Sequence, residues 1–197
     1  MASTIDPTLN GDMTADGRAV NKSELQQQFT AAAADIVDLQ GATLTAGAGI
    51  AGIETFASGD DLIVTRLVID LTGLVGSATD LDIIGDSAAA SANFGQITAA
   101  GAGTLVGGKV TCLETPAGGS DDIDFYSATE ATGTEDAAVT GLTETALLTS
   151  GGAWASGTVK GMTALPAADE YLYVVNGEAA GGTYTAGKFL IELYGTA

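Results

Sequence analysis

The chain contains no histidine, so the side chain that most often moves protons near neutral pH is missing. This absence excludes Ser-His-Asp and Cys-His nucleophilic arrangements, and a single cysteine cannot supply a zinc site of the usual type. Carboxylates remain, and 11 of the 25 acidic residues stand close together in five groups: Asp60/Asp61, Asp80/Asp82, Asp121/Asp122/Asp124, Glu135/Asp136 and Asp169/Glu170. Paired carboxylates can hydrolyse glycosidic bonds, but such sites line aromatic clefts and this chain has one tryptophan. Most of these acids stand beside Gly or Ser in predicted turns, so we expect no enzymatic activity.

The densest acidic segment places Asp121, Asp122 and Asp124 directly after Gly119-Ser120. Carboxylate and backbone oxygens are the ligands that calcium prefers. The spacing does not match the helix-loop-helix calcium motif, so the three aspartates are a candidate calcium site without a supporting motif. We predict no other metal and no cofactor.

Gly103, Gly108 and Lys109 have the G-x-x-x-x-G-K spacing of a phosphate-binding loop. Val110 stands where that motif needs a Ser or Thr hydroxyl for magnesium, and the segment continues as a strand-like sequence. We therefore interpret it as a β-strand with a glycine bulge or kink.

Two single residues have both a structural and a functional interpretation. Cys112 lies in an apolar, strand-like stretch, which favours a buried thiol. Trp154 lies among small residues, which favours a plug in the core or between subunits, with ligand stacking as the alternative.

Residues 23–40 have the strongest helix pattern. Ser23 and Gln26 form a capping box, and Gly41 can end the helix. A stripe with heptad-like spacing runs along it, and it comprises Leu25, Phe29, Ala32, Ile36 and Leu39. The stripe predicts either packing on the chain's own β domain or a short helical bundle, most simply a trimer. We take the stripe, with Arg18 and Lys22, as the candidate assembly interface.

The remaining chain predicts a mainly β fold. Residues 1–22 are an expected extended arm, 41–52 a Gly/Ala linker and 53–197 a β-sandwich domain. Eight or nine short strands separated by turn residues favour a jelly-roll-like antiparallel sandwich, with an immunoglobulin-like sandwich or small barrel as alternatives. Segment 61–71 is expected to be central, and 170–175 and 183–194 to form a terminal hairpin.

The formal charge is −19, from 25 acidic and 6 basic residues. An anionic nucleic acid or membrane surface would repel such a chain, so we predict neither as a partner. No apolar run has the length of a transmembrane helix, and the N-terminus lacks the pattern of a secretory signal. We therefore expect synthesis in a cytoplasm.

The layout resembles virion structural proteins of tailed bacteriophages. The resemblance lies in an arm followed by SELQQQFTAAAADIVDLQ, a Gly/Ala/Thr-rich and Lys-poor β domain, and the closing segment GTYTAGKFLIELYGTA. It implies a non-enzymatic capsid decoration (cement) protein on the capsid exterior. Such a protein would be a homotrimer with the phage major capsid protein as partner, and its arm and first helix would dock on the capsid or on a sister subunit.

Three alternatives stay open at this point. A head-fibre, tail or receptor-binding protein would use exposed groups such as Trp154, Tyr126 or the Asp121–Asp124 loop to bind a host glycan. A virion-borne glycosidase would depend on two carboxylates. A cellular surface-layer or adhesin module would need an export signal.

Overall fold

The computed structural model describes residues 12–13, 19–20, 50–58 and 62–196. The chain divides into two compact units, Met1–Ala42 and Thr43–Ala197. In the first unit, β1 (Asp12–Met13) pairs antiparallel with β2 (Ala19–Val20), inside the range predicted as an extended arm. The helix predicted over 23–40 lies outside the described residues.

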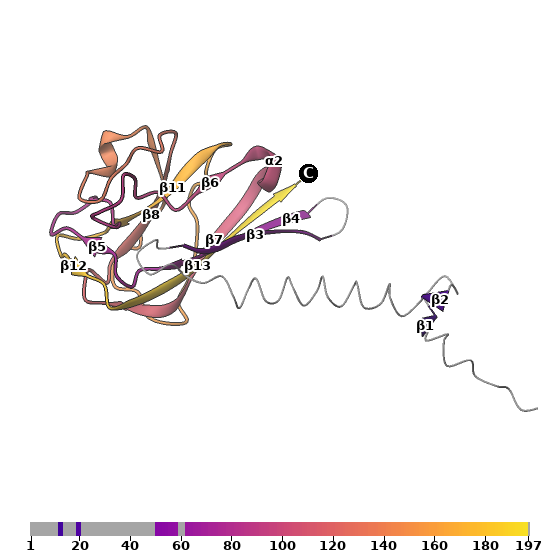
Figure 1. Cartoon of the computed structure of the whole chain (residues 1–197), viewed down its shortest axis with the longest axis horizontal. Helices are drawn as coiled ribbons and strands as arrows, with labels where there is room; N and C mark the ends of the chain where they lie inside the picture. Colours follow the sequence, from indigo (N-terminus) through magenta and orange to yellow (C-terminus); the bar gives the residue numbers. More distant parts are fainter. Residues whose placement is uncertain (1–11, 14–18, 21–49, 59–61, 197) are drawn as a thin grey trace, which may run out of the picture. The chain divides into compact units, whose positions relative to one another are not determined.

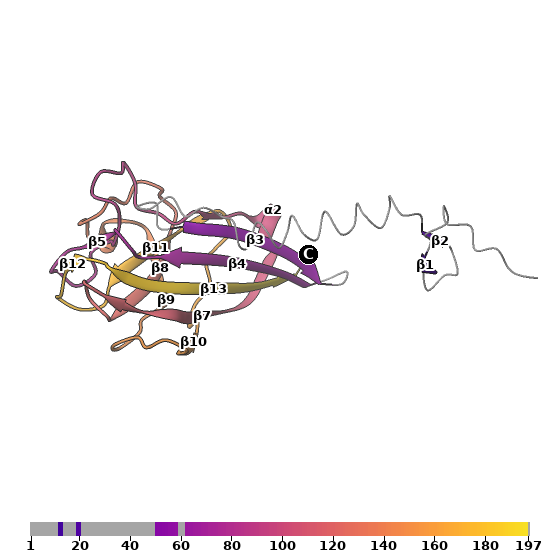
Figure 2. The ribbon, with the colours of Figure 1, turned by 60° about the horizontal axis from the view of Figure 1, so that its bottom comes forward.

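The second unit is built mainly from two antiparallel sheets (Figures 1 and 2). The five-stranded sheet has the order β10-β7-β13-β4-β3, with bounds Val159–Gly161, Thr104–Ala117, Ala186–Thr196, Leu62–Asp70 and Ile50–Ser58. The four-stranded sheet has the order β6-β11-β8-β9, with bounds Gln96–Ile97, Glu170–Asn176, Ile123–Ala128 and Glu144–Leu148. The smaller elements are the β5-β12 pair (Val75–Gly76 and Gly182–Thr183), α2 (Ala99–Ala102) and the 3-10 turn η1 (Val139–Gly141).

The main core is an apolar cluster to which both large sheets contribute side chains. At its centre, Trp154 meets Phe125 of β8 and Phe189 of β13 edge-on, with ring centroids 6.1 and 5.2 Å apart. The indole N–H donates to the carbonyl of Ile123 over 2.8 Å, which satisfies the one polar atom of this side chain. Trp154 is therefore the core plug favoured by its small neighbours, and only 1% of it is exposed.

A second, smaller cluster buries the other face of the four-stranded sheet. It joins Tyr126, Ala128, Tyr173 and Val175 to side chains from loops before β6 and after β8, including Ile83 and Val139. All six residues of β8 are consequently buried. The four-stranded sheet thus has both faces covered, whereas the five-stranded sheet alternates buried and partly exposed residues along β4 and β13.

The mainly β prediction with antiparallel sheets is confirmed, and the arrangement is that of a β-sandwich. The jelly-roll connectivity stays a prediction. Segment 61–71 forms β4, which lies inside the sheet next to β13. β3 begins at Ile50, within the range predicted as a linker.

Two predictions about strands are wrong. Segments 170–175 and 183–194 do not form a hairpin, because β11 pairs with β6 and β8 while β13 pairs with β4 and β7 in the other sheet. Segment 81–84 contributes only isolated bridges at Asp82 and Ile83. Leu81 has a φ of 65°, which interrupts the extended backbone at the start of that segment.

The segment with phosphate-loop spacing is the strand β7, as predicted. Its pairing with β13 skips a residue between Leu105 and Gly107, so a bulge lies at Val106. The backbone of Gly103 has a φ of 64°, at the turn between α2 and β7.

Candidate functional site

The predicted assembly interface lies outside the described residues. Leu25, Phe29, Ala32, Ile36, Leu39, Arg18 and Lys22 all belong to stretches of the N-terminal unit that the structure does not describe. Their role stays a prediction.

Two of the three candidate calcium ligands, Asp122 and Asp124, both bind Ser150. Asp122 Oδ1 accepts a hydrogen bond from the Ser150 hydroxyl over 2.6 Å, and Asp124 Oδ1 accepts one from the Ser150 amide over 2.5 Å. Burial raises the pKa of Asp124, although the Ser150 amide opposes that shift. Across residues 12–13, 19–20, 50–58 and 62–196, no group of three or more His, Cys, Asp or Glu side chains is placed to hold a metal ion.

The aromatic groups proposed for glycan binding are buried. Trp154 lies in the main core, and Tyr126 lies in the second cluster with 7% of it exposed. Cys112 is buried as predicted, and its sulfur contacts the carbonyl oxygen of Glu114 at 3.3 Å. These residues stabilise the sandwich and present no recognition surface.

The most distinctive surface is the outer face of the five-stranded sheet, meaning the face turned away from the main core. On the middle strand β13 its positions are Lys188, Leu190, Glu192 and Tyr194, which alternate with buried Phe189, Ile191 and Leu193. The cross-strand partners of these four residues project from the same face of β4 and β7.

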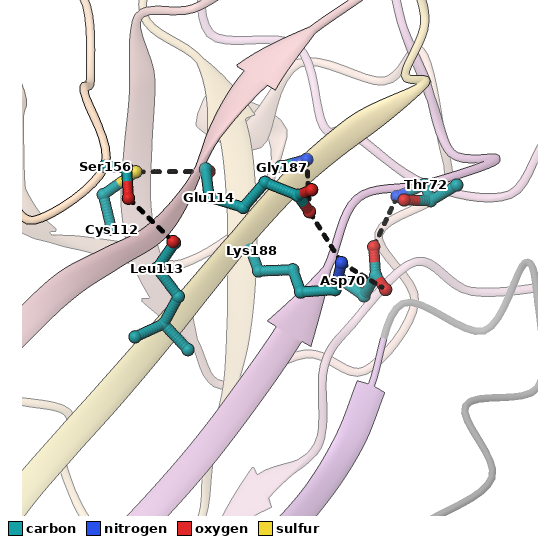
Figure 3. Close-up of polar contacts among 8 residues, drawn as sticks. All are labelled: Asp70, Thr72, Cys112, Leu113, Glu114, Ser156, Gly187 and Lys188. Atoms are coloured by element: carbon teal, nitrogen blue, oxygen red, sulfur yellow. Dashed lines mark hydrogen bonds and ion pairs between the residues drawn. The ribbon is translucent and has the colours of Figure 1, made fainter.

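One row of charges crosses this face at Lys188. Its ammonium lies 2.6 Å from Glu114 Oε2 on β7 and 3.6 Å from Asp70 Oδ2 on β4 (Figure 3). Glu114 also accepts from the amide of Gly187, and Asp70 accepts from the amide of Thr72. The hydrogen bond between Lys188 and Glu114 raises the pKa of Lys188 and lowers the pKa of Glu114.

A second row crosses the same three strands at Glu192, with the signs reversed. Glu192 Oε1 accepts from Arg66 Nε of β4 at 3.1 Å, and Glu192 Oε2 lies 2.8 Å from Lys109 Nζ of β7. Burial alone would raise the pKa of Glu192, but the hydrogen bonds from Lys109 and Arg66 outweigh it and the pKa is lowered. We refer to these sets as the Lys188 row and the Glu192 row.

Apolar side chains fill the space between and around the two rows. Leu190 lies between Val68 and Thr111, and Tyr194 lies beside Val64. The exposed large apolar side chains of the described residues all belong to this sheet: Leu62 at 40%, Val106 at 61%, Leu113 at 45% and Val159 at 57%. Grouped apolar exposure of this kind marks an interaction surface more often than a catalytic site.

A pocket of about 430 Å³ lies at the end of the sandwich where α2 packs. It is lined by small and apolar residues from α2, the start of β7 and the 165–168 loop, including Ile97, Ala102, Leu165 and Pro166. The lining also contains the hydroxyls of Thr98, Thr104 and Thr196, but it has no acidic, basic or cysteine side chain that could activate a nucleophile or move a proton.

Sequence reasoning missed the two charged rows. Their members are far apart in the chain, and only the strand order β7-β13-β4 brings them together. The available signal was the outward position of Arg66, Lys109, Lys188 and Glu192 within strands that are otherwise apolar.

No helix in the described part of the chain is long and apolar enough to cross a membrane. Comparison of the chain with protein-family models, with curated proteins and with solved structures found no match.

Proposed function

We propose that the chain is a non-enzymatic structural protein of a tailed-phage virion, a decoration (cement) protein that binds the exterior of the head and stabilises it. The observation that carries this proposal is the five-stranded sheet, to which all the exposed large apolar side chains of residues 62–196 belong. A surface of this composition suits protein-protein contact. The assignment to a phage head rests on the sequence resemblance.

The division of the chain into two compact units supports separate roles for the N-terminal unit and the β-sandwich. In the proposal, the stripe of Leu25, Phe29, Ile36 and their neighbours joins three copies and contacts the major capsid protein. The β-sandwich projects outward as a rigid body. A capsid repeats each weak contact many times, so a modest interface per copy is enough for stable attachment.

The acidic composition also fits a location on the particle exterior. A charge of −19 per copy keeps neighbouring particles apart and gives no affinity for nucleic acid or an anionic membrane. The proposal therefore includes no nucleic-acid partner, no membrane partner and no cofactor.

The test is sedimentation with phage heads that lack the protein, using two neighbouring substitutions. Phe29→Asp places a charge in the apolar stripe, whereas Gln27→Asp places the same charge on the opposite face of the predicted helix. We expect Gln27→Asp to sediment with heads as the wild type does, and Phe29→Asp to lose about tenfold or more in affinity. Equal binding by the two variants would remove the stripe from the docking site, and absence of wild-type binding would contradict the proposal as a whole.

A further inference from the structure

The two charged rows of the outer face are complementary to each other. The Lys188 row has the order Glu114, Lys188, Asp70 across β7, β13 and β4, which is minus, plus, minus. The Glu192 row has the order Lys109, Glu192, Arg66 across the same strands, which is plus, minus, plus. The rows are four residues apart on β13, about 13 Å, with Leu190 midway between them.

This order selects one way of stacking two identical faces. A two-fold axis in the plane of the interface, running across the strands at Leu190, places each Lys188 row on the Glu192 row of the other copy. Every position then faces an opposite charge: Glu114 faces Lys109, Lys188 faces Glu192, and Asp70 faces Arg66. An axis along the strands would instead place Lys188 on Lys188, and like charges in apposition are strongly unfavourable.

We propose that the outer face is an isologous interface between two copies of this chain, related by the two-fold axis across the strands at Leu190. Leu190 then meets its own copy on the axis, with its cross-strand neighbours Val68 and Thr111 beside it. Such an interface contains an apolar centre between two complementary charged rows, and each residue pair occurs twice.

The net charge of the chain also points to this face. Residues 62–196 contain four basic residues, and three of them, Arg66, Lys109 and Lys188, lie on the outer face. The Lys188 row has a net charge of −1 and the Glu192 row of +1, so the two rows together carry no net charge. Two copies with a formal charge of −19 each would meet there with little local repulsion.

The area of the face is that of a small specific interface. Five strands of 3, 14, 11, 9 and 9 residues, spaced about 4.8 Å apart, give a face of roughly 600 Å² per copy. Stable interfaces bury about 800 Å² per partner, and weaker specific ones bury less. Two sheets in face-to-face contact would pack about 10 Å apart with their strands about 30° from parallel.

This inference goes beyond the proposed function and holds whether or not residues 23–40 join three copies. If they do, the two-fold contact joins two trimers into a closed hexamer. If they do not, the particle is a dimer. In both cases the wild-type mass is an even multiple of the chain mass.

A charge-swap series separates this contact from the ion pairs within one chain. Glu114→Lys and Lys109→Glu each break one pair within a row and place like charges against each other across the interface. We expect each single variant to weaken the association about tenfold or more, as measured by sedimentation velocity of the full chain. The double variant leaves both rows broken internally but restores opposite charges across the axis, so we expect its affinity to return to within about threefold of the wild type.

A cross-linking experiment tests the same interface without charge substitutions, which could prevent folding. Leu190→Cys places a thiol on the two-fold axis, where it meets the same thiol of the other copy, while the native Cys112 is buried. Because facing sheets pack farther apart than a disulfide spans, a short bifunctional thiol reagent is the probe. We expect covalent dimers from Leu190→Cys and none from Ala90→Cys, which lies in an exposed loop.

Three results would overturn the proposal. They are a wild-type chain that is monomeric or odd-numbered at about 100 µM, a double charge swap that associates no better than the single variants, and a Leu190→Cys chain that cross-links no more than Ala90→Cys. If the thiol introduced by Leu190→Cys is also protected from the reagent, the face is covered by a different occupant.

Discussion

Glu192 is the most constrained charged residue of the sheet, with 10% of its side chain exposed and two cations on it. Desolvation of this carboxylate is offset by the hydrogen bonds from Lys109 and Arg66, and its pKa is lowered in the folded state. The ionised form therefore stabilises the fold.

The lowered pKa of Glu192 predicts a pH-dependent contribution to stability. A lowered folded-state pKa stabilises above the unfolded value of 4.5, and this stabilisation is lost as pH falls through the folded-state pKa. We expect Glu192→Gln to reduce the free energy of unfolding by about 1 kcal/mol at pH 7, because the basic partners are partly exposed and solvent weakens the pairs. Below about pH 4 the difference from wild type should shrink. Urea unfolding at pH 7 and below about pH 4 measures this difference in stability, with Asp80→Asn in an exposed loop as the charge control. An equal loss of stability at the two pH values would contradict the stabilising role of the ionised Glu192 side chain.

Trp154 predicts the largest single-residue effect on stability. Trp154→Ala removes a buried indole from between Phe125 and Phe189 and leaves a cavity, so we expect a loss of about 3–5 kcal/mol. Val159→Ala, at a position that is 57% exposed, should change the stability by less than about 0.5 kcal/mol. Urea unfolding compares the two variants, and a small loss for Trp154→Ala would place the indole outside the core.

Single residues differed in how far the sequence could place them. Cys112 and Trp154 were predictable because their neighbours in the chain are apolar or small, and burial follows from local composition. The ion pairs of Glu192 could not be predicted. Its partners Arg66 and Lys109 are 126 and 83 positions away in the chain, and only the strand order brings them together.

At the scale of elements, β13 determines the five-stranded sheet. It pairs with β4 from Lys188 to Thr196 and with β7 from Ala186 to Thr196. Its buried and outward residues alternate, so one strand supplies Phe189 to the core and Lys188 and Glu192 to the outer face. The charged rows exist because this strand is central.

The close approach of α2 to β13 predicts a second stability effect. A Cβ at Gly195 would overlap the carbonyl oxygen of Ala102, so Gly195→Ala should destabilise the fold by about 1–3 kcal/mol. Gly161→Ala on β10 is the matched strand control, because nothing lies within 4 Å of its added Cβ. In thermal unfolding, we expect the midpoint temperature of Gly195→Ala to be lower than that of the wild type, and the midpoint of Gly161→Ala to be unchanged. Equal midpoints for the two variants would mean that α2 does not pack there.

The strands themselves were largely predictable, but their pairing was not. Dense β-branched and apolar runs located β4, β7, β8 and β11, since these runs have few alternatives as buried elements. The expected hairpin of 170–175 with 183–194 was wrong because a local turn signal cannot show that two successive strands enter different layers. Likewise, the positive φ of Leu81 has no signature in the sequence.

At the scale of the whole molecule, an acidic sandwich has two charged rows of opposite net charge on one face and follows a separate N-terminal unit. We assign the face to contact between copies and the N-terminal stripe to three-fold assembly and attachment. These two contacts would use different parts of the chain, so substitutions in one should leave the other intact.

The most direct test of the account is saturation binding of the wild-type protein to phage heads that lack it. If the protein decorates heads, bound protein reaches a plateau at a fixed number of copies per head, and saturated heads release their DNA at a higher temperature than bare heads. Absence of binding, or binding that rises without a plateau and leaves the release temperature unchanged, would contradict a decoration role.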